Sequence, residues 1–345
     1  MSRVILRARA PLRVSFAGGG TDVPPFPERE GGVVLSSTIS RYVYSTLRPR
    51  TDGVITVSSL DFDDSIDFGV EEPVVYDGRL DLPKAAIARM RESRGALPPS
   101  GFDLFLHTDA PPGSGLGSSS AVVVNVLALV AAHCGLDLTT HELAEMACRL
   151  ERQDLAIPGG LQDQYAAAFG GFNFMEFHAE RVVVYPLRLP AATVHELEHN
   201  MLLAYTGETR VSDHIIEDQV SRIEHEDRDA LAGMRAQKEI AHAMKEALLR
   251  GHVDTFGALL GDAWRAKQRM STRISTPRID EAVEVALSVG ALGAKVTGAG
   301  GGGHLLFVCD FERKHLVAKA LTGLDMTVSE FTFSRHGATT WRVPA

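Results

Sequence analysis

The sequence of 345 residues has few cysteines, few aromatic side chains, no excess of positive charge and no long apolar run. Its 3 cysteines are scattered and odd in number, so they give neither a metal-binding spacing nor a disulfide framework, and a reducing cytoplasm is the expected location. The net charge of −9 disfavours nucleic acids and anionic membranes as partners. The longest apolar run, residues 121–132, is too short to span a bilayer. The composition is that of a soluble globular protein with room for two domains.

Glycine, in contrast, is abundant, and one glycine-rich stretch joins a predicted strand to a predicted helix. Residues 111–121 read PPGSGLGSSSA, between an alternating run at 102–107 and an apolar helical segment at 121–130. Glycines allow a ligand to approach the backbone, and the free N–H groups that begin a helix favour phosphate. The serines add hydroxyl groups for phosphate oxygens or Mg²⁺. Because the lysine of a Walker A loop is missing, the stretch is either another kind of phosphate loop or a turn with a serine cap.

Two further glycine-rich stretches lie near the ends of the chain. Residues 17–22, AGGGTD, follow a strand-like run at 3–17, and Asp22 is either a ligand-binding carboxylate or a turn-capping residue. Residues 295–304, KVTGAGGGGH, contain the spacing G-x-G-x-x-G. The apolar run at 304–309 predicts a strand after this stretch, whereas a dinucleotide-binding unit needs a helix there. This order argues against a dehydrogenase.

Two carboxylates are predicted at the facing ends of consecutive helices. Glu151 lies in the last turn of a predicted helix at 139–152, and Asp163 lies 12 residues later, at the start of the next helix. Phosphoryl transfer to a hydroxyl needs one carboxylate to hold Mg²⁺ and one to orient or deprotonate the nucleophile. Asp154 is a rival carboxylate, and the alternative for Asp163 is an acid that complements the helix dipole.

The rest of the pattern predicts an α+β fold. Residues 32–47 are rich in β-branched and aromatic side chains and predict a pair of strands. A strand is expected at 201–205, followed over 210–268 by two long helices that Gly251 separates.

The three glycine-rich stretches, taken in their order along the chain, resemble the three motifs of the small-molecule kinase family that includes galactokinase, mevalonate kinase and homoserine kinase. The resemblance covers nearly the whole chain. It implies a ribosomal-protein-S5-like α/β domain over 1–192 and a ferredoxin-like α/β domain over 193–345, with the active site in the cleft between them. It also implies ATP and Mg²⁺ as cofactors, a small-molecule hydroxyl as acceptor, and a monomer or homodimer.

The resemblance to galactokinase assigns roles to individual residues. It implies that Asp163 is the catalytic base and that Arg13, near the phosphoryl-transfer site, helps to hold it ionised. Galactokinases have Glu-His where this chain has Gly19-Gly20, so the pocket is expected to be roomier there. The implied Mg²⁺ ligands are Ser119 and Glu151. The implied ATP-binding residues are Pro112, Gly113, Ser114, Gly115, Leu116, Gly117, Ser118, Ser119 and Ser120. The implied sugar-binding residues are Gly19, Gly20, Thr21, Asp22, Asp163, Gly300 and Gly301.

The expected substrate is a sugar with a phosphate of its own. The string GGLQDQYAAAFGGFNF at 159–174, with AGGGTD, resembles most the heptose 7-phosphate kinases. The resemblance implies conversion of D-glycero-D-manno-heptose 7-phosphate to the 1,7-bisphosphate at the anomeric hydroxyl. The alternatives are an octose 8-phosphate, a free sugar such as fucose or galactose, and a non-catalytic sugar sensor. Intact Asp163, Glu151 and Ser119 argue against the sensor.

An acidic protein that binds a sugar phosphate needs a local positive site. Arg210 follows the turn TGET, and Lys267 lies in the basic stretch 265–278. We interpret both as ligands of the sugar's own phosphate, because charge-assisted hydrogen bonds suit a phosphate group. The alternative is that both side chains lie on solvated helix faces, with Arg210 paired to an acid such as Asp213.

Overall fold

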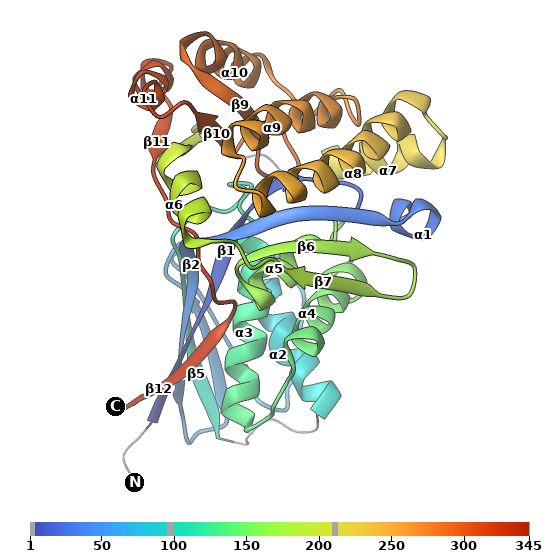
Figure 1. The fold of residues 1–345 in the computed structure, drawn as a ribbon. Coiled ribbons are helices and arrows are strands. Elements are labelled where there is room, and N and C mark those ends of the chain that lie inside the picture. The colour runs from blue at the N-terminus through green and yellow to red at the C-terminus, as the bar shows by residue number, and fades with distance from the viewer. Residues whose placement is uncertain (1–3, 95–99, 209–212, 345) are drawn as a thin grey trace.

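Two long strands, β1 (Val4–Ala17) and β2 (Gly32–Pro49), form the frame of the molecule and pair antiparallel along most of their length. The computed structural model describes residues 4–94, 100–208 and 213–344. Within these ranges the chain forms two sheets covered by helices (Figure 1). Val4 pairs with Pro344, so both ends of the described chain lie together at one end of the first sheet.

The alternating residues at 32–47 form one continuous strand, so the predicted strand pair is wrong. Between residues 33 and 48 the sequence has no glycine, proline or asparagine that could make a turn. The first half of β2 pairs with β6 (Phe172–Phe177) and the second half with β5 (Gly101–Thr108). One strand therefore pairs with different neighbours along its two halves.

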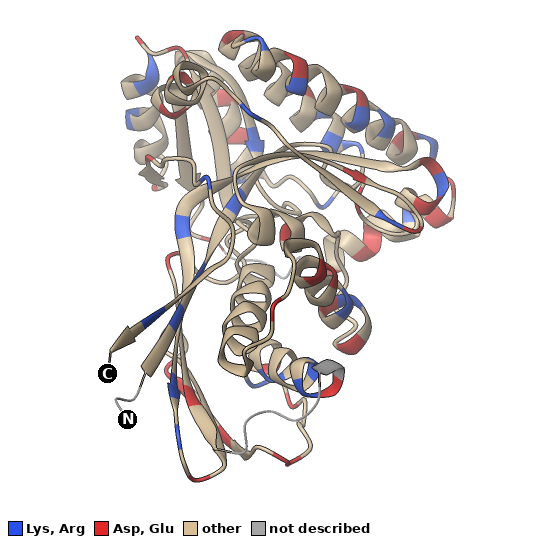
Figure 2. Ribbon diagram, turned by 60° about the horizontal axis from the view of Figure 1, so that its bottom comes forward, with Lys and Arg blue, Asp and Glu red and all other residues tan. Residues whose placement is uncertain are grey.

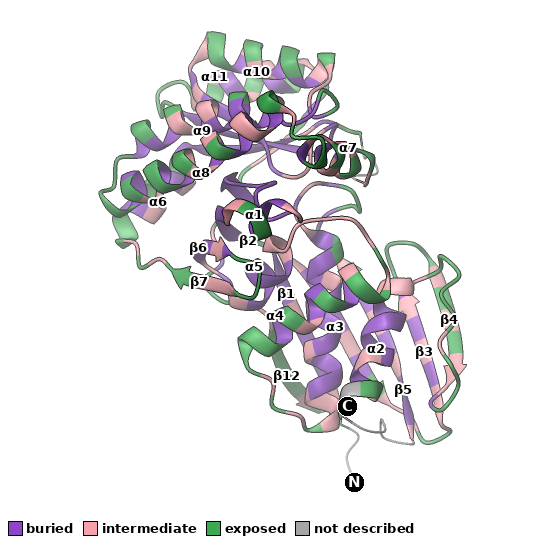
Figure 3. Ribbon diagram, turned by 90° about the vertical axis from the view of Figure 1, so that its right-hand side faces the viewer, coloured by how far each residue is buried: buried purple, intermediate pink, exposed green. Residues whose placement is uncertain are grey.

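The first sheet contains eight of the described strands, and helices cover one of its faces (Figures 1 and 3). Across the sheet the order is β12 (Thr339–Pro344), β1, β2, β5, β3 (Val54–Ser59) and β4 (Asp64–Gly69), with β6 and β7 (Val182–Pro186) on the other end of β2. The helices of this layer are α2 (Asp81–Arg94), α3 (Ser118–Cys134), α4 (Thr140–Arg149) and α5 (Gln162–Phe169), with a short α1 (Phe26–Glu30) outside it. Helix α3 is buried along most of its length, as its apolar sequence predicts.

The second sheet has the ferredoxin-like arrangement that the resemblance implies. Its strands are β8 (Met201–Tyr205), β9 (Ala291–Val296), β10 (His304–Cys309) and β11 (Thr327–Ser329). The sheet order is β11-β8-β10-β9 and every pair is antiparallel, as a β-α-β-β-α-β connection requires. The helices of this part are α6 (Ala191–Asn200), α7 (Asp213–Glu224), α8 (Arg228–Leu249), α9 (Val253–Gln268), α10 (Pro277–Val289) and α11 (Lys314–Gly323).

Two expectations for the second half of the chain differ from the structure. The described part of 210–268 forms three helices rather than two, because Asp227 caps a further helix start, accepting hydrogen bonds from the Asp229 and Ala230 N–H groups. The last strand, β12, returns to the first sheet, so the segment 193–345 does not form one sheet by itself. Apolar residues of both halves share one core, in which Phe256 of α9 contacts the ring of Phe16 of β1.

In the view of Figure 2, the helices carry residues of both charge signs along their length. Among the helices that the structure describes, none is long and apolar enough to cross a membrane.

Candidate active site

The loop at residues 109–117, which the sequence predicts to bind phosphate and which is called the phosphate loop here, leads from β5 into α3, and its glycines are needed for the backbone path. Gly113, Gly115 and Gly117 have φ of 71°, 79° and 74°, in the left-handed region that side chains disfavour. A Cβ on Gly117 would lie 3.2 Å from Asp163 Oδ2. The loop therefore brings the free N–H groups at the start of α3 next to the expected catalytic carboxylate.

Some of the expected ATP-binding residues line a cavity, and the others are buried behind the loop. Gly113, Gly115, Gly117 and the three serines 118–120 line a cavity of about 220 Å³, called here the first cavity, together with Arg13, Asp22, Glu151 and Asp163. Pro112 lines a second cavity of about 660 Å³, which shares Gly113, Ser118 and Ser119 with the first. Ser114 and Leu116 are buried behind the loop, and their carbonyl groups accept hydrogen bonds from His304 and Arg13.

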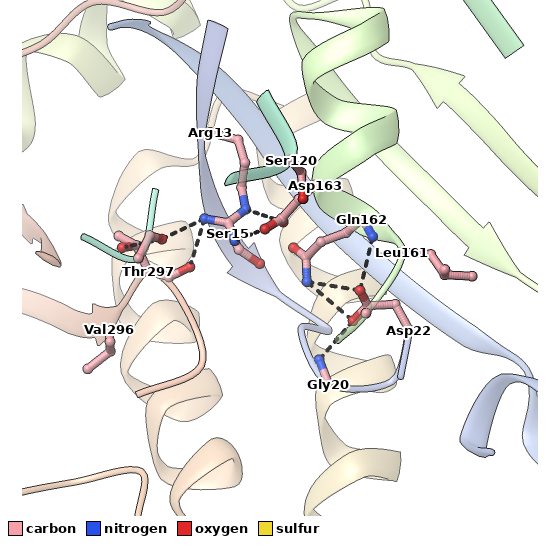
Figure 4. Close-up of polar contacts among 12 residues, drawn as sticks. Arg13, Ser15, Gly20, Asp22, Ser120, Leu161, Gln162, Asp163, Val296 and Thr297 are labelled. Atoms are coloured by element: carbon pink, nitrogen blue, oxygen red, sulfur yellow. Dashed lines mark hydrogen bonds and ion pairs between the residues drawn. The ribbon is translucent and has the colours of Figure 1, made fainter. Parts of the chain in front are cut away.

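Arg13 and Asp163, which both line the first cavity, form an ion pair with two hydrogen bonds (Figure 4). Arg13 Nε donates to Asp163 Oδ1 and Nη2 donates to Oδ2, each at 2.7 Å. Nη1 donates to the carbonyl oxygen of Gly115 at 2.6 Å. Because Arg13 is buried on β1, this one guanidinium fixes the orientation of Asp163 relative to the phosphate loop.

Glu151 lies in a π-helical turn, η1 (Leu150–Asp154), rather than in the last turn of an α-helix. It accepts a hydrogen bond from Ser120 Oγ at 3.1 Å, whereas Ser119, which the sequence paired with it, is exposed and lines the same cavity. Burial raises the pKa of Glu151, and its Oε1 has no hydrogen-bond partner in the described chain. The rival Asp154 forms an ion pair with Arg89 at 3.3 Å and does not line the cavity.

Asp22 is buried and lines the first cavity, and its carboxylate accepts hydrogen bonds from backbone N–H groups, as a turn-capping residue does (Figure 4). Its carboxylate accepts hydrogen bonds from the Gly20 N–H at 2.9 Å and from the Gln162 N–H at 3.0 Å. The Gln162 side-chain Nε2 also donates to it, at 3.2 Å. A Cβ on Gly160 would lie 2.0 Å from Asp22 Oδ2, so glycine is required there. Asp22 thus joins the first glycine turn to the start of α5.

Of the other residues expected to bind sugar, some line the first cavity and some do not. Gly19 and Gly20 line the first cavity. The Thr21 hydroxyl donates to the carbonyl groups of Gly18 and Val33 and accepts from the Val33 N–H, so the backbone occupies it. Gly300 and Gly301 pack against Ile274 and do not line the cavity.

Other side chains lie close to the points where side chains on Gly19 and Gly20 would begin. A Cβ on Gly20 would lie 2.2 Å from Met270 Cε, and Gln219 Oε1 lies 3.5 Å from the same point. A Cβ on Gly19 would lie 3.2 Å from Ser15 Oγ. Side chains of the second half of the chain fill the space beside Gly20.

The third glycine loop, residues 297–303, packs directly on the phosphate loop. A Cβ on Gly298 would lie 2.8 Å from Gly115 Cα, and a Cβ on Gly303 would lie 2.6 Å from the Ser114 carbonyl oxygen. A strand, β10, follows this loop, so the dehydrogenase interpretation is excluded. The glycines of this loop allow its backbone to approach the backbone of the phosphate loop closely.

Two buried lysines line the first cavity. Lys267 of α9 is only 3% exposed. Burial lowers the pKa of Lys267 to about 8, and the charge of Asp22 partly opposes this shift. Lys295 of β9 donates to the carbonyl oxygens of Ser15 and Val296 at 2.9 and 3.1 Å, and burial holds its pKa well below the usual range. Arg210, the other basic residue expected here, lies outside the described residues.

Sequence reasoning missed several residues of the first cavity, namely Ser15, Arg152, Gln162, Gln219 and Lys295. Lys295 carried a usable signal, because a lysine within an apolar strand beside a glycine motif has to find partners. Gln219 carried none, because it lies in an ordinary amphipathic helix pattern.

Together, the two domains and the carboxylate at a glycine-rich phosphate loop define a small-molecule kinase. The GHMP kinases N terminal domain matches residues 81–171, and the GHMP kinases C terminal domain matches residues 244–323. The chain is 39% identical over 339 residues to D-glycero-alpha-D-manno-heptose 7-phosphate kinase of Campylobacter jejuni, covering 98% of this chain and 99% of the relative. The chain belongs to the GHMP kinase family, and it is a phosphotransferase that uses ATP.

Two solved structures illustrate the fold. The structure of a D-glycero-D-manno-heptose 1-phosphate kinase from Bacteroides thetaiotaomicron has a TM-score of 0.82 and 35% identity, covering 99% of this chain and 100% of that one. The galactokinase of Lactococcus lactis, complexed with galactose, has a TM-score of 0.78 at 18% identity, covering 98% of this chain and 95% of that one. This second likeness shows a shared fold.

Proposed function

We propose that the protein transfers the γ-phosphoryl group of ATP to the anomeric hydroxyl of D-glycero-D-manno-heptose 7-phosphate, giving the 1,7-bisphosphate. The observation that carries the proposal is the Asp163 carboxylate, which Arg13 holds between the phosphate loop and a cavity rich in unsatisfied polar groups. The full-length relative named a heptose 7-phosphate kinase supports this choice of sugar. An octose 8-phosphate would have the same reacting carbon and remains the nearest alternative.

The second cavity suits the nucleoside of ATP. Its walls include apolar side chains of strands and helices of the first sheet, such as Val43, Leu106 and Val122. It shares Gly113, Ser118 and Ser119 with the first cavity, so a nucleotide there would have its phosphates at the start of α3.

Glu151 and Ser120 are the proposed Mg²⁺ ligands, with Ser119 beside them. Both supply oxygen, as Mg²⁺ prefers, and Glu151 Oε1 is a buried oxygen without a partner among the described residues. The described chain has no cluster of three or more acidic, histidine or cysteine ligands, which fits an ion that takes its remaining ligands from phosphate and water. Mg²⁺ bound there would neutralise charge on the transferring phosphoryl group.

Asp163 is the proposed base. A hydroxyl group placed against one carboxylate oxygen would be oriented toward the phosphates at Gly117, which lies within van der Waals reach of Asp163. Arg13 keeps the carboxylate in one orientation while the proton moves to it. These residues position the reactants and stabilise charge, which is most of what phosphoryl transfer requires.

Lys267 is the proposed ligand of the sugar's own phosphate, with Arg210 as the second. The buried ammonium group of Lys267 lines the first cavity near Asp22 and Asp163, and an anion would repay its burial. This assignment favours a phosphorylated sugar over free fucose or galactose.

A screen of ADP release tests the proposed function. We expect turnover with heptose 7-phosphate and little with free heptose, fucose or galactose, and the matched control is Asp163→Asn, which keeps the shape of the site. Faster turnover with an octose 8-phosphate or with a free sugar would reassign the substrate, and equal turnover by the Asn variant would reassign the base.

A further inference from the structure

Four buried polar atoms without hydrogen-bond partners in the described chain belong to residues that line the first cavity. They are Ser15 Oγ, Glu151 Oε1, Gln162 Oε1 and Gln219 Nε2. Buried polar atoms are nearly always bonded, so a group of orphans around one cavity marks the surface that a polar ligand completes. The first three belong to the first domain, within or beside the recognised motifs. Gln219 belongs to α7, in the second half of the chain, and no motif accounts for it.

The position of Gln219 is set by its neighbours. The side chain is only 2% exposed, and its Nε2 is a buried donor without a hydrogen-bond partner among the described residues. Its Oε1 lies 3.5 Å from where a Gly20 side chain would begin, and Met270 Cε occupies the rest of that space. Gly20 has φ of 107°, which also disfavours any side chain. Because Gly20 has no side chain, Gln219 of α7 and Met270 lie beside this turn.

We propose that Gln219 is a specificity-determining residue whose amide forms a hydrogen bond with one hydroxyl of the bound sugar. The inference rests on the proposed sugar kinase function and adds a contact from the second half of the chain. The Nε2 group is a donor, and a sugar hydroxyl oxygen can accept its hydrogen bond, so the ligand can satisfy the atom that the described chain leaves unpaired. A sugar lacking that hydroxyl would leave the buried amide unpaired and would be rejected.

The test is Gln219→Met, which keeps the length of the side chain and removes its hydrogen bonds. We expect the KM for the sugar phosphate to rise about tenfold, the usual effect of losing one such bond, with little change in the KM for ATP. The melting temperature of the free protein should rise, because the variant buries no unpaired amide. Gln219→Leu serves as a second variant if the first does not fold.

The matched control is Gln237→Met. Gln237 is also buried, but its Oε1 accepts from the Gly18 N–H at 2.7 Å and its Nε2 donates to the Ala263 carbonyl oxygen at 2.5 Å. This variant should lower the melting temperature, because it leaves backbone groups unpaired. Opposite shifts in the two variants distinguish a ligand-facing amide from a structural one.

Monodeoxy analogues of the sugar phosphate identify the contact. With one analogue, the KM of the wild-type protein and of Gln219→Met should become equal, because the hydroxyl that the amide contacts is absent. The proposal is overturned if the variant leaves the sugar KM unchanged, lowers the melting temperature as Gln237→Met does, or changes the KM of every analogue by the same factor. If the wild-type protein phosphorylates no sugar phosphate, the proposed function fails first, and that result is separate from the comparison of variants.

Discussion

Replacing Lys267 with Met should stabilise the empty protein and weaken its binding of the sugar phosphate. The side chain is 3% exposed and lines the first cavity. Burial lowers its pKa from 10.5 to about 8. A shift of this size corresponds to about 3 kcal/mol of unfolding free energy, since each pKa unit is worth about 1.4 kcal/mol.

The sign of the pH dependence follows from this lowered pKa. Below pH 8 the lysine is charged in both the folded and the unfolded chain, so the folded protein carries the whole cost of the buried charge. Between pH 8 and 10.5 the folded protein loses the proton first, and the cost disappears. At pH 7 the Met variant should therefore be more stable than wild type by up to about 3 kcal/mol, and the difference should shrink toward pH 10.

Urea unfolding of both proteins between pH 7 and pH 10 measures this difference. Lys319→Met is the matched control, because Lys319 is exposed on α11, and its variant should show no such pH-dependent gain. In kinetics, Lys267→Met should raise the KM for the sugar phosphate about tenfold or more and leave the KM for ATP nearly unchanged. A less stable Met variant at pH 7, or an equal loss with the dephosphorylated sugar, would refute the reasoning.

Two other predictions concern the carboxylates. Asp163→Asn should lower kcat by about 10²- to 10⁴-fold, the usual effect of losing a positioned acid–base group, with ATP binding retained in calorimetry; near-normal turnover would place the base elsewhere. Because burial raises the pKa of Glu151, activation by Mg²⁺ should weaken as the pH falls through that raised pKa. Ser120→Ala should raise the Mg²⁺ concentration needed for half-maximal activity more than Ser119→Ala, because Ser120 is the serine hydrogen-bonded to Glu151; the reverse order would favour Ser119 as the Mg²⁺ ligand.

The sequence predicted the parts of the site that local chemistry determines. The phosphate loop was recognisable from three closely spaced glycines before an apolar helical segment. In the structure these glycines have positive φ and the helix is buried. The strand after the third glycine loop was recognisable from its continuous apolar run at 304–309, since both its faces are buried. Such features depend on neighbours along the chain.

The remaining features depend on tertiary packing between distant segments. Met270 and Gln219 lie beside Gly20 because α7 and the end of α9 pack there, which the residues around Gly20 do not indicate. The hydrogen bond between Ser120 and Glu151 joins α3 to a π-helical turn that the sequence did not predict. The continuous β2 follows from pairing with β6 and β5 along its length.

The most direct test of the central claim is ³¹P NMR of the product formed from ATP and heptose 7-phosphate. The account predicts that the 7-phosphate signal persists and that a new phosphate signal appears, coupled to the anomeric proton and growing with the ADP signal. Asp163→Asn should form this product at least about 10²-fold more slowly. A new phosphate on any other carbon, or ADP formation without a sugar bisphosphate, would contradict the account.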